Sequence, residues 1–148
     1  MPVRVQPHDF DAGAEIATLR AGNLNVGAVA AFIGTVRDLN EGAGVSAMTL
    51  EHYPGMTERA LEDICAQARA RWNLLDALVI HRHGPLAPGD QIVLVAVTAT
   101  HRGEAFAACE FIMDYLKTQA PFWKKERTSH GERWVEARDT DDAAAARW

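Results

Sequence analysis

The sequence predicts an α+β fold, in which helices and strands are mixed and some strands pair as antiparallel hairpins. Two long stretches, residues 57–72 and 102–118, carry apolar side chains at helical spacing along one face. Around them, short segments rich in β-branched residues are separated by turns that contain glycine or proline. Mixed elements with hairpins are typical of the α+β class.

The first half of the chain is expected to form two strands between two helices, with a polar, glycine-containing loop separating the strands. The expected elements are a helix at 9–20, a buried strand at 26–36, the loop at 40–44, a strand at 45–52 and a helix at 57–72. Pro54 and Gly55 precede the second helix, and Thr57 is its expected N-cap.

The second half is expected to form a hairpin with a long connection, a helix and a last hairpin. The expected elements are strands at 74–81 and 91–98 around a turn at 84–90, a helix at 102–118, hairpin strands at 122–128 and 133–137, and an alanine-rich tail at 141–148. The near-continuous β-branched run at 91–98 is typical of a central strand. Pro121 disfavours α geometry at Ala120, so the helix is expected to end there.

Length and composition indicate one compact domain, residues 1–148, with a substantial core, since 48% of the residues are hydrophobic. No apolar run approaches the roughly 18 residues of a membrane-spanning helix. The first residues lack the apolar region of a signal peptide, so none is expected. Cys65 and Cys109 lie far apart with no Cys-x-x-Cys motif, which favours the reducing cytoplasm.

The charge distribution indicates a site for a small anion. The chain has a net charge of −5, whereas residues 117–133 hold five Lys or Arg against two Glu, a local balance of +3 (5 − 2). Cations gathered beside aromatic and apolar residues in an acidic protein favour a small anionic ligand. The acidic total charge disfavours nucleic-acid binding.

Lys117 and Lys124 are the leading candidates for chemistry. A single lysine at the C-terminal end of a helix more often complements the helix dipole and stays solvated. Here, however, Lys117 lies near the end of the helix and Lys124 follows the Pro121 turn, so both ammonium groups can face one space. Such a pair suits general acid–base or nucleophilic catalysis.

Three further cations are candidates for binding the anion. His101 and Arg102 directly precede the helix at 102–118, whose free N–H groups favour phosphate, although a capping histidine beside a solvated arginine is the simpler interpretation. Arg37 follows the 26–36 strand beside the polar loop, where binding residues and ordinary exposed arginines both occur.

The other histidines and the cysteines predict no additional site. His52, His81 and His83 lack the spacing of a zinc site, so no metal is expected, and no motif indicates a resident cofactor. Cys65 and Cys109 fall on apolar helix faces and are expected to be inert core thiols.

Six blocks of sequence stand out in order along nearly the whole chain. They are Phe32-Ile-Gly-Thr-Val-Arg37, Leu50-Glu-His-Tyr-Pro-Gly-Met-Thr57, Ile80-His-Arg-His-Gly-Pro-Leu-Ala-Pro-Gly-Asp90, Thr100-His-Arg-Gly-Glu-Ala-Phe106, residues 111–126 and Arg133-Trp-Val-Glu-Ala137. Together they resemble the large, catalytic subunit of molybdopterin synthase. The string Tyr115-Leu-Lys-Thr-Gln-Ala-Pro-Phe-Trp-Lys124 is too long and specific for chance, whereas residues 39–46 match less well.

The resemblance implies a fold, a reaction and partners. The fold is an α/β hammerhead with an additional antiparallel β subdomain. The enzyme is a sulfurtransferase of molybdenum cofactor biosynthesis, which installs the two dithiolene sulfurs of molybdopterin on cyclic pyranopterin monophosphate. Each sulfur arrives as the C-terminal thiocarboxylate of a small ubiquitin-like carrier subunit that ends in Gly-Gly. The large subunit forms a homodimer that binds a carrier at each distal end, giving a heterotetramer.

The resemblance also assigns roles to individual residues. Lys117 matches the lysine nearest the carrier's C-terminus, and Lys124 matches a second essential lysine, with the acid and base roles open between them. Phe32 and Met113 are weaker candidates for lining the path of the carrier's tail. The expected substrate-binding residues, some of them acting across the dimer interface, are Arg37, His101, Arg102, Lys117 and Lys124.

Two other functions fit part of the sequence. A non-catalytic module would use the basic pocket only to hold a phosphorylated metabolite or the tail of a partner, and the intact pair Lys117 and Lys124 argues against it. A persulfide sulfurtransferase would require an exposed, reactive cysteine, whereas Cys65 and Cys109 both fall on buried faces.

Overall fold

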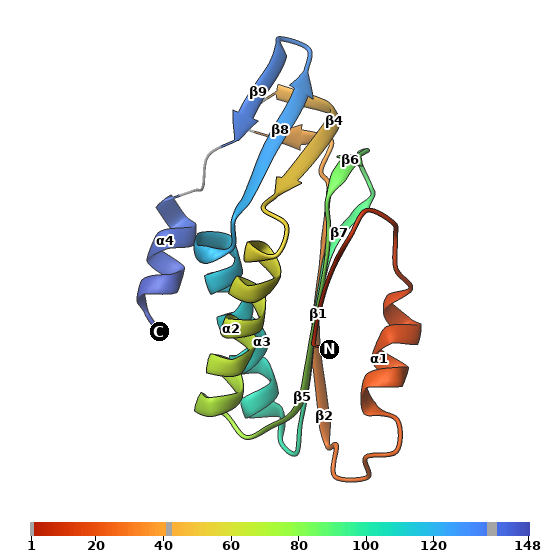
Figure 1. Ribbon diagram of the computed structural model, residues 1–148, viewed down its shortest axis with the longest axis vertical. Helices are drawn as coiled ribbons and strands as arrows, with labels where there is room; N and C mark the ends of the chain where they lie inside the picture. Colours follow the sequence, from red (N-terminus) through yellow and green to blue (C-terminus); the bar gives the residue numbers. More distant parts are fainter. Residues whose placement is uncertain (1, 41–42, 136–138) are drawn as a thin grey trace.

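The computed structural model describes residues 2–40, 43–135 and 139–148, which form two sheets and four helices (Figure 1). The helices are α1 (Ala12–Arg20), α2 (Met56–Arg71), α3 (Arg102–Gln119) and α4 (Asp139–Ala146). The strands are β1 (Val3–Gln6), β2 (Ala28–Thr35), β3 (Leu39–Asn40), β4 (Ala43–His52), β5 (Leu74–Arg82), β6 (Gly84–Leu86), β7 (Gln91–Ala99), β8 (Phe122–Thr128) and β9 (Gly131–Val135). The predicted α+β class is confirmed.

The first sheet has the strand order β1-β5-β7-β2, with α1 on one face and α2 and α3 on the other (Figure 1). As predicted, β7 is a central strand, paired antiparallel with both β5 and β2. The short β1 extends the sheet by pairing parallel with β5. The hairpin predicted for the segments 74–81 and 91–98 is therefore confirmed.

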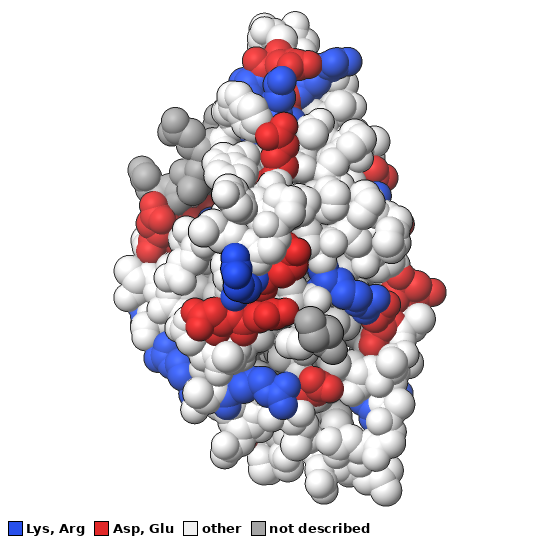
Figure 2. All heavy atoms as spheres, viewed as in Figure 1, with Lys and Arg blue, Asp and Glu red and all other residues white. Residues whose placement is uncertain are grey.

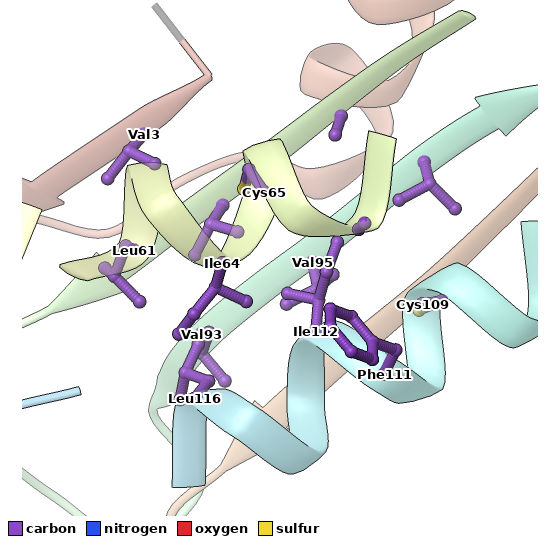
Figure 3. Close-up of a cluster of buried hydrophobic side chains, with 14 of the residues drawn as sticks. Val3, Leu61, Ile64, Cys65, Val93, Val95, Cys109, Phe111, Ile112 and Leu116 are labelled. Carbon is purple, nitrogen blue, oxygen red and sulfur yellow. The ribbon is translucent and has the colours of Figure 1, made fainter. Parts of the chain in front are cut away.

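The core fills both faces of this sheet because β5 and β7 bury their side chains alternately on either side. Val79, Val93 and Val95 belong to the larger cluster, which packs against α2 and α3 (Figure 3). Ile80 and Leu94 belong to a smaller cluster against α1. Burial on both faces explains the near-continuous apolar sequence of β7.

The strand at 26–36 was expected to be buried, and this prediction is wrong. β2 lies at the edge of the sheet, where Val29, Phe32 and Ile33 are 37%, 41% and 42% exposed. A short apolar run has the same appearance in a central strand and in an edge strand that exposes apolar residues. The composition therefore indicated a strand correctly but not its position in the sheet.

The second sheet has the order β3-β4-β8-β9, with β6 also paired to β4, and all of its ladders are antiparallel. It corresponds to the additional antiparallel subdomain that the family resemblance implied. The hairpin of β8 and β9 is confirmed, although residues 136–137 of its second predicted strand lie outside the described residues. The predicted turn at 84–90 is wrong in its first part, since residues 84–86 form β6.

The loop predicted at 40–44 is shorter in the structure, because two strands reach into it. Asn40 ends β3, and Ala43 and Gly44 begin β4, pairing with β3 in an antiparallel ladder. Residues 41 and 42 of the predicted loop lie outside the described residues. The alternation that indicated a strand at 45–52 therefore marked most of β4, which begins two residues earlier than predicted.

The ends of the helices correct one sequence prediction and confirm another. Gly55, with φ of +83°, is the N-cap of α2, and Thr57 lies inside the helix. The buried Thr57 hydroxyl accepts from the Tyr53 N–H at 2.9 Å and donates to the Pro121 carbonyl at 3.0 Å, so it ties α2 to the start of β8. Ala120 is extended, and α3 ends before it as Pro121 required.

Two terminal segments depart from their predicted form. Helix α1 begins at Ala12 and not at residue 9, since the Asp11 carboxylate accepts from the Ala14 N–H and caps the helix there. The alanine-rich tail forms α4, which packs on α3 (Figure 1). At its end the Trp148 indole donates to Asp114 at 2.6 Å. Across the described residues, no helix is long and apolar enough to cross a membrane.

Candidate active site

A cavity of about 440 Å³ lies where the end of β2, the last turn of α3 and the inner face of β8 meet. Part of its wall is apolar, and part carries cationic side chains and two carboxylates. The lining residues are Phe32, Ile33, Gly34, Thr35, Arg37, Met48, His81, Ile92, Val93, Leu116, Lys117, Ala120, Phe122, Lys124, Glu126, Val135 and Asp141. The volume falls in the range of small-molecule sites, roughly 300–1,000 Å³.

Lys117 and Lys124 line this cavity together, as their positions around the Pro121 turn predicted. Leu116 anchors the last turn of α3 in the core, and the adjacent Lys117 is exposed. In β8, successive side chains point to opposite faces, which places Lys124 and Glu126 in the cavity wall. The two lysines therefore meet because Lys117 lies in the last turn of α3 and the alternation of side chains along β8 directs Lys124 to the same cavity.

The remaining cations of the basic segment do not line the cavity. Lys125 and Arg127, at the alternate positions of β8, pair with Glu132 of β9 at 3.0 and 3.1 Å. Glu126 lies in the wall, 2% exposed, and pairs with Arg133 at 3.3 Å. Sequence reasoning did not single out Glu126, although the period of two that selects Lys124 also selects it.

Arg37 lines the same cavity, two residues after β2. The backbone before it is fixed, because the Val36 N–H donates to the Asp90 carbonyl at 2.9 Å and the Val36 carbonyl accepts from Gly89 at 2.8 Å. Phe32 also lines the cavity. At Gly34 a Cβ would lie 2.9 Å from Val93 Cγ1, so bare backbone forms this part of the wall.

His101 and Arg102 lie far from the cavity. They precede and begin α3, whereas Lys117 lies in its last turn, about 23 Å away at about 1.5 Å per residue. The His101 side chain is 79% exposed, makes no capping hydrogen bond and lies 3.7 Å from the Glu104 carboxylate. The structure therefore does not bring these two residues to Lys117 and Lys124 within one chain.

Met113 does not line the cavity either. It lies four residues before Lys117 on α3, and its half-buried side chain packs against the main core cluster. Because residues four apart share one face of a helix, Met113 is a neighbour of Lys117 on the α3 surface.

Sequence reasoning missed His81, a buried residue in the cavity wall. Its ring stacks on Phe122, with centroids 3.7 Å apart and planes 17° from parallel. Burial, together with the nearby charges of Lys117 and Lys124, lowers the pKa of His81 from its ordinary value to about 3. The sequence could have indicated this position, because His81 lies two residues after the buried Val79. Alternate residues of a strand share one face, so His81 continues the inward-facing row of β5.

Cys65 and Cys109 are buried free thiols, as the sequence predicted. Burial raises the pKa of Cys65 to about 12 and that of Cys109 to about 11, so neither forms a thiolate at neutral pH. Over the face seen in Figure 2, Lys and Arg side chains are interspersed with Asp and Glu. That face lacks the continuous positive surface that a nucleic acid would require.

Comparisons with known proteins agree on one family. Residues 5–119 match the family model described as MoaE protein. The molybdopterin synthase catalytic subunit of Ralstonia nicotianae is 70% identical over 99% of this chain and 83% of its own length.

Solved structures give the same result. The molybdopterin biosynthesis MoaE protein of Burkholderia ambifaria is 64% identical and superposes with a TM-score of 0.85 over 99% of this chain and 96% of its own. The molybdopterin synthase of Staphylococcus aureus is 30% identical, with a TM-score of 0.83 over 89% of this chain and 95% of its own.

Proposed function

The chain belongs to the MoaE protein family, and from this premise we propose that it is the catalytic subunit of a molybdopterin synthase. In this function residues 1–148 act as a single domain. The enzyme is a sulfurtransferase of molybdenum cofactor biosynthesis and converts cyclic pyranopterin monophosphate into molybdopterin. Two sulfurs are transferred, each from the C-terminal thiocarboxylate of a small ubiquitin-like carrier, whose terminus takes an oxygen from water in place of the sulfur and becomes a carboxylate.

The observation that carries this proposal is the convergence of Lys117, Lys124 and Arg37 on one partly apolar cavity. The reaction handles three anionic groups: the thiocarboxylate, the carboxylate that replaces it and the substrate phosphate. Fixed cations in a partly desolvated site stabilise such charges more strongly than water does. The apolar part of the wall suits the pterin ring and the Gly-Gly tail of the carrier.

Each cation has a distinct task in this scheme. Lys117 holds the carrier's terminus, first as thiocarboxylate and then as carboxylate, while Arg37 binds the substrate phosphate through its planar, two-pronged guanidinium group. Lys124 transfers a proton as the cyclic phosphate opens and sulfur adds. Phe32 in the cavity wall and Met113, one turn before Lys117 on α3, line the path of the tail.

A second copy of the chain supplies His101 and Arg102 to the anion pocket. Both side chains are exposed at the N-terminal end of α3, where the helix dipole and free N–H groups favour a phosphate. The exposed apolar residues of β2, among them Val29 and Ile33, offer a surface for such a homodimer. With one carrier bound to each copy, the assembly is a heterotetramer.

The cytoplasm is the proposed location of the reaction. Cys65 and Cys109 are both free thiols, and a reducing compartment maintains thiols in this state.

The experiment that tests the function mixes the purified protein with a thiocarboxylated carrier and cyclic pyranopterin monophosphate, and assays for molybdopterin. Product formation that depends on both additions is the expected result. A folded protein that binds the carrier but yields no product would instead favour the non-catalytic binding module.

A further inference from the structure

His81 is held in one orientation by contacts on two sides. Its ring stacks on Phe122, and its Nδ1 lies 2.8 Å from the carbonyl oxygen of Arg82. That carbonyl is itself fixed, since the His83 N–H of the same peptide group donates to the Gln6 carbonyl at 3.0 Å. The His81 side chain therefore has little freedom to rotate.

The bond to Arg82 determines which ring nitrogen carries the proton. A carbonyl oxygen can only accept a hydrogen bond, so Nδ1 of His81 is the protonated nitrogen. Burial disfavours a second proton, as do the charges of Lys117, Lys124 and His52. The ring is therefore neutral, and its Nε2 presents a lone pair.

The Nε2 atom opens into the cavity. Among the described residues, the one side-chain nitrogen or oxygen that is fully enclosed without a hydrogen-bond partner is Thr98 Oγ1. His81 Nε2 has no protein partner in this part of the chain, so solvent must reach it. His81 as a whole is only 4% exposed and forms part of the cavity wall, which makes the cavity the route of access.

We propose that Nε2 of His81 accepts a hydrogen bond from an N–H or O–H group of the substrate bound in this cavity. This role rests on the proposed function and refines it. Arg37, Lys117 and Lys124 are hydrogen-bond donors that suit anionic groups, whereas an aminopyrimidinone ring such as that of a pterin presents N–H donors. A neutral acceptor serves such a donor without adding negative charge that would repel the substrate phosphate.

The test compares two substitutions of His81. In His81→Asn the amide nitrogen can still donate to Arg82, but the side chain ends short of the Nε2 position. In His81→Gln the longer side chain can place its amide oxygen close to that position. Binding of cyclic pyranopterin monophosphate to the purified protein is measured by calorimetry, with inorganic phosphate as the comparison ligand.

We expect His81→Asn to weaken binding of cyclic pyranopterin monophosphate about threefold to tenfold, the usual worth of one neutral hydrogen bond. Affinity for inorganic phosphate stays unchanged, and His81→Gln recovers most of the loss. His81→Asn binding like wild type would overturn the proposal, and so would an equal loss for both ligands with a lower melting temperature. Wild-type protein that binds no cyclic pyranopterin monophosphate would instead refute the proposed function, and this role with it.

Discussion

The two ends of α3 carry similar cations in very different surroundings. At the C-terminal end, Lys117 shares a cavity with Lys124, because the chain turns at Pro121 and returns as β8. At the N-terminal end, His101 and Arg102 are exposed. The chain reaches this end directly from β7, and neither His101 nor Arg102 lines the cavity that holds Lys117.

This difference shows what turns a group of cations into a site. Both ends of α3 carry cations. Only at the C-terminal end, where β8 returns beside α3, do the cations lie in the wall of a cavity that partly desolvates them and fixes their geometry. The N-terminal end has the helix dipole and free N–H groups without an enclosing surface. Under the proposed function it is therefore half of a site, completed by the cavity of a second copy.

The largest expected effect is the loss of turnover in Lys117→Ala or Lys124→Ala. Removing a fixed cation from the position where charge develops should lower the rate about 10²- to 10³-fold. Lys125→Ala is the matched control, since Lys125 lies on the same strand and pairs with Glu132 outside the cavity. It should keep near-normal turnover in the molybdopterin assay.

Melting temperatures of all three lysine variants should remain close to that of the wild type, because none of these lysines is fully buried. Near-normal turnover in either Lys117→Ala or Lys124→Ala would remove that lysine from the mechanism. The cavity at the C-terminal end of α3 would then not be distinguished from the N-terminal end by a catalytic lysine.

The next effect tests whether the two ends of α3 meet across a dimer. Arg102→Ala should lower turnover about 10- to 100-fold, the worth of a charged hydrogen-bonding partner to phosphate. When Arg102→Ala and Lys117→Ala proteins are mixed and allowed to exchange subunits, each mixed dimer regains one intact site. Half of the dimers are mixed, so about a quarter of wild-type turnover should return. A mixture as inactive as its parents would place Arg102 outside the shared site.

The sequence predicted the centre of the fold well because two independent patterns agreed there. The β-branched run of β7 and the helical spacing of Ala105, Cys109, Ile112 and Leu116 both reported burial, and the structure buries all of these residues. Prediction failed at edges. Nothing in the composition of β2 distinguishes an edge strand with exposed apolar residues from a buried one, and the pairing of β6 with β4 depends on contacts distant in sequence.

The residues of the candidate site likewise divide into those that the sequence predicted and those that it missed. Lys117 and Lys124 were predicted together because a short turn joins them, so their proximity is a local property. His81 and Glu126 were missed because each enters the cavity through a strand whose neighbours are known only in three dimensions. His101 shows the opposite case: the predicted helix at 102–118 already separates it from Lys117 by the length of α3, so in a single chain the two residues belong to opposite ends of the helix.

The pH dependence of stability gives a smaller effect at the enclosed end of α3. Folding lowers the pKa of His81 from 6.5 to about 3, with Lys117, Lys124 and His52 facing the ring. Between these values the unfolded chain binds a proton that the folded protein excludes, so the free energy of unfolding falls as the pH drops below about 6.5. The His81→Gln variant has no titrating group at this position, so it lacks this fall in the free energy of unfolding.

Urea denaturation of the wild type and of His81→Gln at pH 7, 6 and 5 measures this pH dependence of the free energy of unfolding. Relative to wild type, the His81→Gln variant should gain on the order of 2 kcal/mol between pH 7 and pH 5. A difference that stays constant over this range would show that His81 titrates near its ordinary pKa, and that the end of α3 is less enclosed than its geometry indicates.

The smallest expected effect concerns Cys109, halfway along α3 between the two ends. A persulfide mechanism would move the chemistry to this thiol or to Cys65, but burial raises both pKa values and both side chains belong to the core. Native protein treated with iodoacetamide should therefore remain unlabelled and fully active, while urea-unfolded protein reacts at both cysteines. Rapid labelling of the native protein with loss of turnover would support the persulfide route. The proposed scheme would then lose its basis in the lysines of the C-terminal end.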